Sequence, residues 1–313
     1  MQHHKTLLYL CITISVINLF AILFYSRVSG GSRSVTAASY EGFPEEWQQT
    51  VDVAVPAEIS FAGEAVPLRR RDVQEALRRE LIVNTYLHSH SIQIMKHAPR
   101  IFARIEPLLK EHGIPDDFKY LAVIESNLNP LAVSPSGATG IWQFMPETAK
   151  EFGLEIDSEV DERFNIEKAT VAAAGYLKKS YERFGSWTTA AAAYNAGGNM
   201  VQKQMEIQKE EKYYDLLLGE ETERYLFRIL AMKQILTHPR LYNFDTPEAY
   251  PVEKIEIVEV SGPVNDLADF AQKQGISYKT LKRFNPWLRK PKLRNASHKT
   301  YHILIPAEKE YYR

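Results

Sequence analysis

The stretch Ile114–Trp142 limits what this chain can fold into, because it places one carboxylate among the apolar positions of a helix. Pro115 suits the first turn of a helix, where its missing N–H would have no partner anyway, and the two aspartates that follow favour the positive end of the helix dipole. Glu125 falls on one helical stripe with three apolar residues. These are Phe118, Leu121 and Ala122. We therefore predict a helix that turns a glutamate toward the protein interior.

Glu125 also stands near the predicted end of this helix. Asn127, Asn129 and Pro130 break the helical pattern directly after it, so the carboxyl is expected where apolar walls meet a loop that a substrate can approach. A carboxyl against apolar walls keeps its proton to higher pH, which a general acid near neutrality requires. The alternative is an ion pair between Glu125 and an Arg or Lys from elsewhere in the chain.

Further motifs extend the catalytic interpretation. They are Ser126, Gly137-x-x-Gly140-x-Trp142-Gln143-Phe144-Met145, Ala193-Tyr194-Asn195-Ala196-Gly197 and Glu221-Thr222-Glu223-Arg224-Tyr225. Over roughly residues 66–237 the chain resembles the soluble lytic transglycosylases, a family of enzymes that cleave peptidoglycan. The resemblance implies a mainly α, lysozyme-like catalytic domain, which we place at residues 67–240.

The same resemblance implies roles for individual side chains. It makes Glu125 the single catalytic acid and base, and it assigns substrate binding to a further set: Ser126, Gln143, Tyr194, Asn195 and Tyr225. Trp142 to Met145 combine flat apolar surfaces with one amide, a mixture suited to sugar rings. Structural alternatives remain for each part. The glycine-containing segment can be a plain turn, the aromatic residues can belong to the core, and Tyr194 can be a buried tyrosine before a helix stop.

The motifs that resemble the cleft contain no second carboxylate. Glu147 and Glu221 are explained by helix starts, and Asp161-Glu162 by a charged turn. Because hydrolytic glycosidases usually use two carboxylates, we expect Glu125 to act twice. The predicted reaction cleaves the β-1,4 bond between N-acetylmuramic acid and N-acetylglucosamine and leaves 1,6-anhydromuramic ends. The alternatives are a hydrolytic, lysozyme-like muramidase and a catalytically inactive glycan-binding scaffold.

Amphipathic patterns predict the other helices of the catalytic domain. They cover residues 71–90, 92–112, 166–184, 188–194 and 221–236. Residues 40–67 are expected to run extended over this domain, and residues 131–140 to form a loop beside the glutamate. A proline-containing linker at residues 238–252 follows the last helix.

A small α+β module is predicted at residues 253–307. A strand, two short helices and a second strand are expected at residues 255–260, 265–273, 278–284 and 301–305. This βααβ order resembles a LysM domain, which implies binding to glycans that contain N-acetylglucosamine. The chain departs from the usual pattern at Ser261–Asn265 and carries a basic insertion at Lys290–Lys299. The resemblance therefore predicts the fold of the module and leaves its glycan binding open.

Leu7–Tyr25 contains no charged residue and would be about 28 Å long as a helix, close to the thickness of the hydrocarbon core of a bilayer. Residues 1–30 are therefore interpreted as an N-terminal membrane anchor or signal, and residues 31–66 as a tether and extended segment. A cleaved signal peptide is the competing interpretation. The implied function requires a catalytic domain that faces the periplasm of a bacterial cell envelope.

Charge, cysteine and histidine content exclude several kinds of site. A net charge of −1 provides no basic field for nucleic acid. Cys11 is the only cysteine, so an internal disulfide framework is ruled out, and His88-x-His90 lacks further ligands at zinc-like spacing. We therefore expect no metal and no cofactor. The expected partners are peptidoglycan glycan strands, the membrane, and proteins of cell-wall assembly or remodelling.

Overall fold

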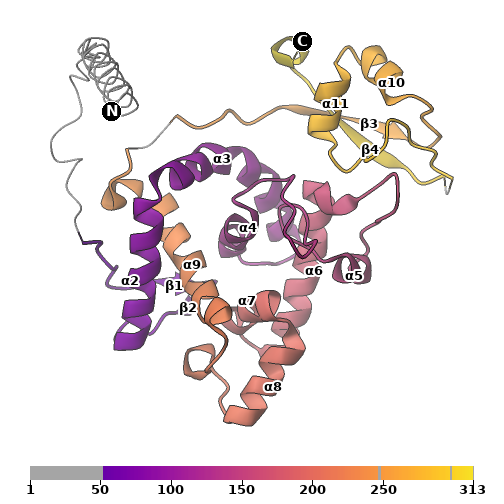
Figure 1. The fold of residues 1–313 in the computed structure, drawn as a ribbon. Coiled ribbons are helices and arrows are strands. Elements are labelled where there is room, and N and C mark those ends of the chain that lie inside the picture. Colours follow the sequence, from indigo (N-terminus) through magenta and orange to yellow (C-terminus); the bar gives the residue numbers. More distant parts are fainter. Residues whose placement is uncertain (1–51, 246–247, 297, 313) are drawn as a thin grey trace, which may run out of the picture. The chain divides into compact units, whose positions relative to one another are not determined.

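The computed structural model describes residues 52–245, 248–296 and 298–312, and Asp52–Arg313 form one compact unit (Figure 1). Helices dominate it, and a small α+β module follows them, so the predicted fold class is confirmed. The predicted anchor Leu7–Tyr25 and most of the predicted tether lie outside the described residues. Within the described part of the chain, no helix is long and apolar enough to cross a membrane.

The first two long helices meet at Leu87. Helix α2 spans Arg71–Tyr86 and α3 spans His88–Glu111, so the predicted end of the first helix at residue 90 is wrong. Leu87 leaves the helical conformation with ψ at 57°, although its N–H still donates to the carbonyl of Val83. The ring of His88 packs edge-on against the ring of Phe244, with 5.7 Å between the ring centres. The two residues are far apart in the sequence, so the local pattern could not predict this contact.

The helix that carries Glu125 forms as predicted, with a tighter first turn. A 3-10 turn, Asp116–Phe118, leads into α4, Lys119–Ser126. Phe118, Leu121 and Ala122 are fully buried, which confirms the apolar stripe. This short helix packs against α3 and against α9, Glu220–Thr237, so its stability comes from burial and not from its own length.

Three further helices follow α4 in the chain. Helix α5 spans Pro146–Glu151 and α6 spans Ile166–Phe184, which ends at Gly185 with φ at +66° as predicted. Helix α7 spans Trp187–Ala196 and packs on α6 and α9, while α2 and α9 lie side by side (Figure 1). Alanines along α6 and α7 let these helices approach closely, and eight of them are buried.

A short hairpin fixes the start of α7. Strands β1, Ser60–Phe61, and β2, Glu64–Ala65, pair antiparallel within the segment predicted to run extended. The carboxylate of Glu64 accepts hydrogen bonds of 2.5–3.0 Å from the hydroxyl of Ser186 and the N–H groups of Trp187 and Thr188. A negative charge on the free N–H groups of a helix start is stabilising, so this contact ties the hairpin to the helix bundle.

Helix α8, Gly198–Gln208, is absent from the sequence-based prediction, which considered a helix stop directly after Tyr194. The stop itself is present, because Gly197 has φ at +84° and ends α7. A new helix then begins at Gly198. The two consecutive glycines therefore mark a change of direction between two helices.

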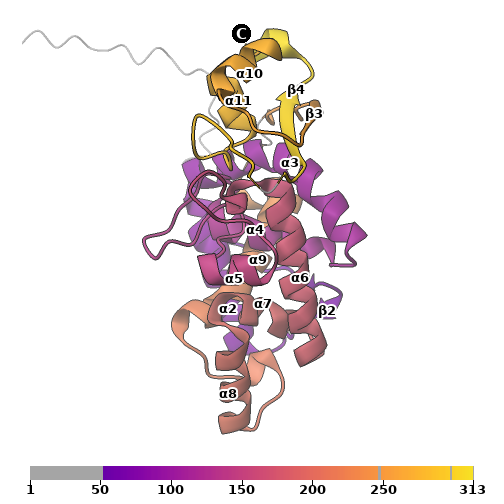
Figure 2. The ribbon, with the colours of Figure 1, turned by 90° about the vertical axis from the view of Figure 1, so that its right-hand side faces the viewer.

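The C-terminal module has the predicted βααβ order. Its elements are β3, Ile255–Val260; α10, Leu267–Lys273; α11, Tyr278–Phe284; and β4, Tyr301–Pro306. The strands pair antiparallel with Ile257 opposite Leu304; α11 packs against β4, and α10 packs against α11 (Figures 1 and 2). The side chain of Asp266 accepts from two N–H groups at the start of α10, which explains why that helix starts later than residue 265.

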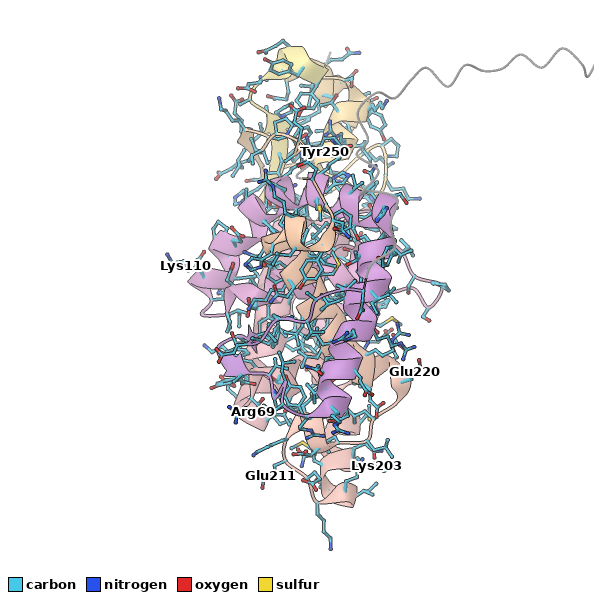
Figure 3. The ribbon with its side chains drawn as sticks, turned by 90° about the vertical axis from the view of Figure 1, so that its left-hand side faces the viewer. Arg69, Lys110, Lys203, Glu211, Glu220 and Tyr250 are labelled. Atoms are coloured by element: carbon cyan, nitrogen blue, oxygen red, sulfur yellow. The ribbon has the colours of Figure 1, made fainter. Side chains whose placement is uncertain are left out.

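The segment between α9 and the module lies against α3. Its Tyr250, labelled in Figure 3, donates its N–H to the carbonyl of Lys96 at 2.9 Å and packs its ring against His97. The guanidinium of Arg100 lies 5.3 Å from the centre of the same ring. The predicted linker is thus held on the catalytic domain along this stretch.

Candidate active site

Glu125 lies in the last turn of α4, and the chain leaves the helix two residues later. Asn127 adopts the left-handed conformation at φ +54°, a position that asparagine tolerates better than most residues. The glutamate side chain is partly exposed, whereas the residues one and two turns earlier on its stripe are fully buried. The carboxyl therefore stands at the boundary between core and surface, as predicted.

Tyr225 of α9 donates a short hydrogen bond from its hydroxyl to Oε1 of Glu125. The structure thus joins two of the predicted site residues that are 100 positions apart in the chain. Burial raises the pKa of Glu125 to about 7, while the hydrogen bond from Tyr225 favours the charged form and opposes the rise. A carboxyl with this pKa exchanges a proton readily near neutral pH.

Two charged residues of α9 act on the same carboxyl, and neither of them is among the predicted site residues. Arg228 lies one turn after Tyr225 and lowers the pKa of Glu125, whereas Glu221 lies one turn before Tyr225 and raises it. Arg228 also lowers the pKa of His90, after the larger effect of burial. It makes no hydrogen bond or ion pair with any residue that the structure describes. A basic residue at helical spacing from Tyr225 is the signal that could have identified it.

Tyr194, in the last turns of α7, is close enough to Glu125 for the charge of the carboxylate to act on it. Its hydroxyl donates to the carbonyl of Trp142 at 2.7 Å, and its ring packs edge-on against Phe144 and Tyr176. Burial raises the pKa of Tyr194 well above its usual value, and the charge of Glu125 raises it further. Tyr194 thus remains neutral and connects the carboxyl with the loop that follows α4.

Asn195 and Ser126 are placed differently from the two tyrosines. Oδ1 of Asn195 accepts from the hydroxyl of Thr222 at 2.9 Å, which links the end of α7 to the first turn of α9. The hydroxyl of Ser126 is buried and donates back to the carbonyl of Ala122 at 3.1 Å. Both side chains therefore form hydrogen bonds within the protein, and Ser126 offers little surface to a ligand.

Gln143 follows the predicted loop, residues 131–140, directly. The chain turns back on itself here, because Val133 pairs with Thr139 and Thr139 pairs with Phe144. Its φ is +50°, an uncommon value for a residue with a side chain. The side-chain nitrogen donates to the carbonyls of Gly140 and Ala132, at 2.7 and 3.3 Å. The amide nitrogen thus holds the loop together.

Trp142 belongs to the core. Its ring is fully buried, and its indole N–H donates to the hydroxyl of Thr170 at 2.9 Å. This agrees with the alternative that the aromatic cluster is structural.

The other acidic residues also have defined surroundings. Glu147 and Glu221 lie in the first turns of α5 and α9, as predicted. Asp161 and Glu162 begin a short 3-10 turn, Glu162–Phe164, and each is only 8% exposed, so the charged turn is buried. Asp161 forms an ion pair with Arg163 at 2.8 Å, which offsets the cost of its burial. Among the residues that the structure describes, no group of acidic, histidine or cysteine side chains could hold a metal ion.

Comparison with known proteins identifies two domain families. The transglycosylase SLT domain matches residues 104–217, and the soluble lytic transglycosylase C-terminal LysM-like domain matches residues 256–309. Membrane-bound lytic murein transglycosylase D of Escherichia coli K12 is 29% identical over 218 residues, which cover 68% of this chain and 47% of that protein. The chain thus spans about half the length of this relative.

Other similar proteins match over shorter regions. Peptidoglycan transglycosylase gp16 of Escherichia phage T7 is 35% identical over 118 residues, or 37% of this chain and 9% of that protein. Among solved structures, the 70 kDa soluble lytic transglycosylase of Escherichia coli is 26% identical, covering 43% of this chain and 24% of that one with a TM-score of 0.37. The chain is thus similar to the transglycosylase SLT domain over a region that contains Glu125, and to the LysM-like domain of the soluble lytic transglycosylases over its C-terminal region.

Proposed function

We propose that this protein is a peptidoglycan lytic transglycosylase that cleaves the β-1,4 bond between N-acetylmuramic acid and N-acetylglucosamine. The observation that carries the proposal is the carboxyl of Glu125, which has a pKa of about 7 and accepts a hydrogen bond from Tyr225 at the open end of α4. It lies within the part of the chain that matches the SLT domain. An acid of this pKa can donate a proton in one step and take one back in the next.

In the proposed reaction, protonated Glu125 gives its proton to the glycosidic oxygen as the bond from that oxygen to C1 of the muramic acid breaks. The resulting carboxylate then takes the proton from the C6 hydroxyl of the same sugar as the C6 oxygen bonds to C1. The attacking and attacked atoms belong to one ring, so no water needs to be held in place. Glu125 ends the cycle protonated, and the product carries a 1,6-anhydro ring.

The remaining predicted residues would bind the glycan around this carboxyl. The carbonyl oxygen of Gln143 and the ring of Tyr194 are suited to the N-acetyl group and the sugar face. We assign Asn195 to the binding surface, the buried Ser126 to the support of the last turn of α4 beside it, and Tyr225 to the orientation of Glu125. These assignments rest on the motifs and on the packing around Glu125 described above.

A hydrolytic muramidase is the competing function, and Glu221 is the carboxylate that favours it. Its charge acts on Glu125, so it is the first candidate for a second catalytic group. However, Glu221 is exposed and lies in the first turn of α9, where an acidic residue is explained by the helix dipole. A glycan-binding scaffold without activity would have no need of an acid with a raised pKa.

Mass spectrometry of digested peptidoglycan distinguishes these functions. We expect muropeptides with 1,6-anhydromuramic ends, which are lighter by one water than the reducing ends left by hydrolysis. Glu125→Gln, which cannot transfer the proton, should release neither product. Mainly reducing ends would support the hydrolytic muramidase, and no products from the wild-type chain would support the scaffold.

The cellular setting belongs to the same proposal. A peptidoglycan-cleaving enzyme must reach the cell wall, so we assign residues 1–30 to a membrane anchor or signal, residues 31–66 to a tether, and the catalytic domain at residues 67–240 to the periplasm. The module at residues 253–307 would bind glycan strands. Pull-down of the inactive Glu125→Gln chain by insoluble peptidoglycan tests this binding. Membrane fractionation of cells that express the full chain tests the anchor.

A further inference from the structure

The segment Glu155–Phe164, which connects α5 and α6, belongs to the catalytic domain in sequence but to the LysM-like module in packing. Val160 and Phe164 are 1% and 6% exposed, and both are part of the hydrophobic core of the module, together with Leu267, Trp287 and Leu288. The backbone follows the same arrangement, because Val160 pairs with Leu288 as in a sheet. The module thus completes its core with residues of the catalytic domain.

Polar contacts secure this segment to the module. The N–H of Asp161 donates to the carbonyl of Trp287 at 2.9 Å, and the N–H of Arg289 donates to the carbonyl of Glu159 at 2.7 Å. The buried carboxylate of Glu159 accepts from the side chain and the backbone N–H of Arg294, at 2.6 and 2.8 Å. Arg294 lies in the basic insertion that departs from the usual LysM pattern, so the insertion has a binding partner inside the protein.

The other side of the same segment holds the loop that carries Gln143. Arg163 is only 8% exposed, and its guanidinium donates to the carboxylate of Asp161 at 2.8 and 3.0 Å. Its third nitrogen donates to the carbonyls of Gly137 and Phe144, at 2.9 and 3.2 Å. Both carbonyls belong to the loop after α4. Because a guanidinium is planar and rigid, the position of Asp161 sets the position of these donors.

Asp161 therefore contacts both the module and the arginine that holds the loop. Its backbone N–H is bound by the module, and its carboxylate is bound by the arginine that holds the loop. The contact is also close at the backbone, because a Cβ on Gly140 would lie 1.8 Å from the carbonyl oxygen of Arg163. The loop and the segment are in van der Waals contact and cannot shift independently by much.

We propose that the LysM-like module positions the substrate-binding loop, residues 131–144, through Asp161 and Arg163. Arg163 is then a positioning residue, and the module contributes to cleavage even of glycans too short to reach the module itself. The proposal rests on the proposed function in assigning that loop to substrate. A module that served only to attach the enzyme to the wall would not affect the turnover of short soluble fragments.

The test uses full-length variants and a short soluble glycan fragment as substrate. Arg294→Met removes the charged contact of the module with Glu159, and Arg163→Met removes both contacts with the loop carbonyls. Lys254→Met is the matched control, because Lys254 forms an ion pair with Glu308 inside the module and does not contact the segment. We expect kcat/KM to fall about tenfold in Arg163→Met, less in Arg294→Met, and not at all in Lys254→Met.

Two further readouts separate positioning from a general loss of stability. Hydrogen exchange of the Gly140 and Phe144 amides should become faster in Arg163→Met and Arg294→Met and stay unchanged in Lys254→Met. The double variant should lose no more activity than Arg163→Met alone, because both changes act on one chain of contacts. If Arg294→Met does not fold, Glu159→Gln tests the same contact.

The proposal would be overturned if Arg294→Met and Glu159→Gln had the same hydrogen-exchange rates and the same kcat/KM as the wild type. Additive losses of kcat/KM in the double variant would overturn it as well. The exchange measurement does not depend on catalysis. If the wild-type chain cleaved nothing, the proposed function would fail while the coupling between module and loop could still be measured.

Discussion

Glu125 gains its chemical character from residues on three helices. Its own helix α4 supplies the buried stripe, α7 supplies Tyr194, and α9 supplies Tyr225 with the two charges on either side of it. Burial favours the protonated acid and Tyr225 favours the carboxylate, so the pKa of about 7 reflects a balance. Changes to single charges should therefore move the pH dependence of the reaction in predictable directions.

Arg228→Met and Glu221→Gln should shift the pH profile of kcat/KM in opposite directions. Removing the positive charge of Arg228 destabilises the carboxylate, so the pKa of Glu125 rises and the alkaline limb of the profile moves to higher pH. Removing the negative charge of Glu221 does the reverse. The measurement is kcat/KM from about pH 4 to pH 9. Parallel shifts in both variants would show that the limb does not report Glu125.

Glu125→Gln should stabilise the protein above neutral pH. The folded-state pKa of Glu125, about 7, lies above its ordinary value of 4.5, so the folded protein holds this proton after the unfolded chain has lost it. Stability is therefore lost as pH rises from about 4.5 to about 7, by at most about 3 kcal/mol. Urea denaturation should show Glu125→Gln to be more stable than wild type at pH 8 and equal to it near pH 4. Equal stability at both pH values would contradict the raised pKa.

At the scale of elements, the loop after α4 depends on one glycine for its contact with the Glu155–Phe164 segment. Gly140 has φ at +81°, and a Cβ there would meet the backbone of Arg163. Gly137 has a similar φ of +88°, but a Cβ there would meet nothing within 4 Å. An alanine at position 137 therefore adds backbone strain alone, whereas an alanine at position 140 adds both backbone strain and a steric clash.

Gly137→Ala should cost about 1–2 kcal/mol of unfolding free energy, which is the strain of a left-handed alanine. Gly140→Ala should cost more, by about another 1–3 kcal/mol, because the backbone of the loop or the segment must move. Denaturant unfolding measures both values, and activity on soluble glycan should fall further in Gly140→Ala. Equal destabilisation of the two variants would mean that the loop moves away from Arg163 without cost.

At the scale of the whole molecule, the shared core predicts that the catalytic domain and the LysM-like module unfold together. Phe164 belongs to the core of the module while its neighbour Arg163 holds the loop of the catalytic domain. Scanning calorimetry should therefore show a single transition, with calorimetric and van't Hoff enthalpies in agreement. Phe164→Ala should lower the temperature of that whole transition. Two resolved transitions, with only one of them moved by Phe164→Ala, would show that the domains are energetically independent.

Residues that are neighbours along one helix or strand could be predicted well. The buried stripe of Phe118, Leu121 and Ala122, the span of α6 and the βααβ order all follow from periodicities that the chain carries locally. Glu125 as the candidate acid follows from the same local pattern. Where a distant contact decided the outcome, the prediction failed. His88, for example, packs against Phe244 beyond the end of α2.

By itself, the sequence determined which residues of the Glu125 helix face the core, where Glu125 lies on that helix, and which two domain families the chain resembles. Only the tertiary structure decided how those parts act on one another. It brought Tyr225 and Arg228 to Glu125, placed Asp161 and Glu162 in a buried segment, and turned the basic insertion of the module toward Glu159. The physical reason is that burial, hydrogen bonds and charge act over a few ångströms of space between residues that are far apart in the chain. A local pattern contains no measure of those distances.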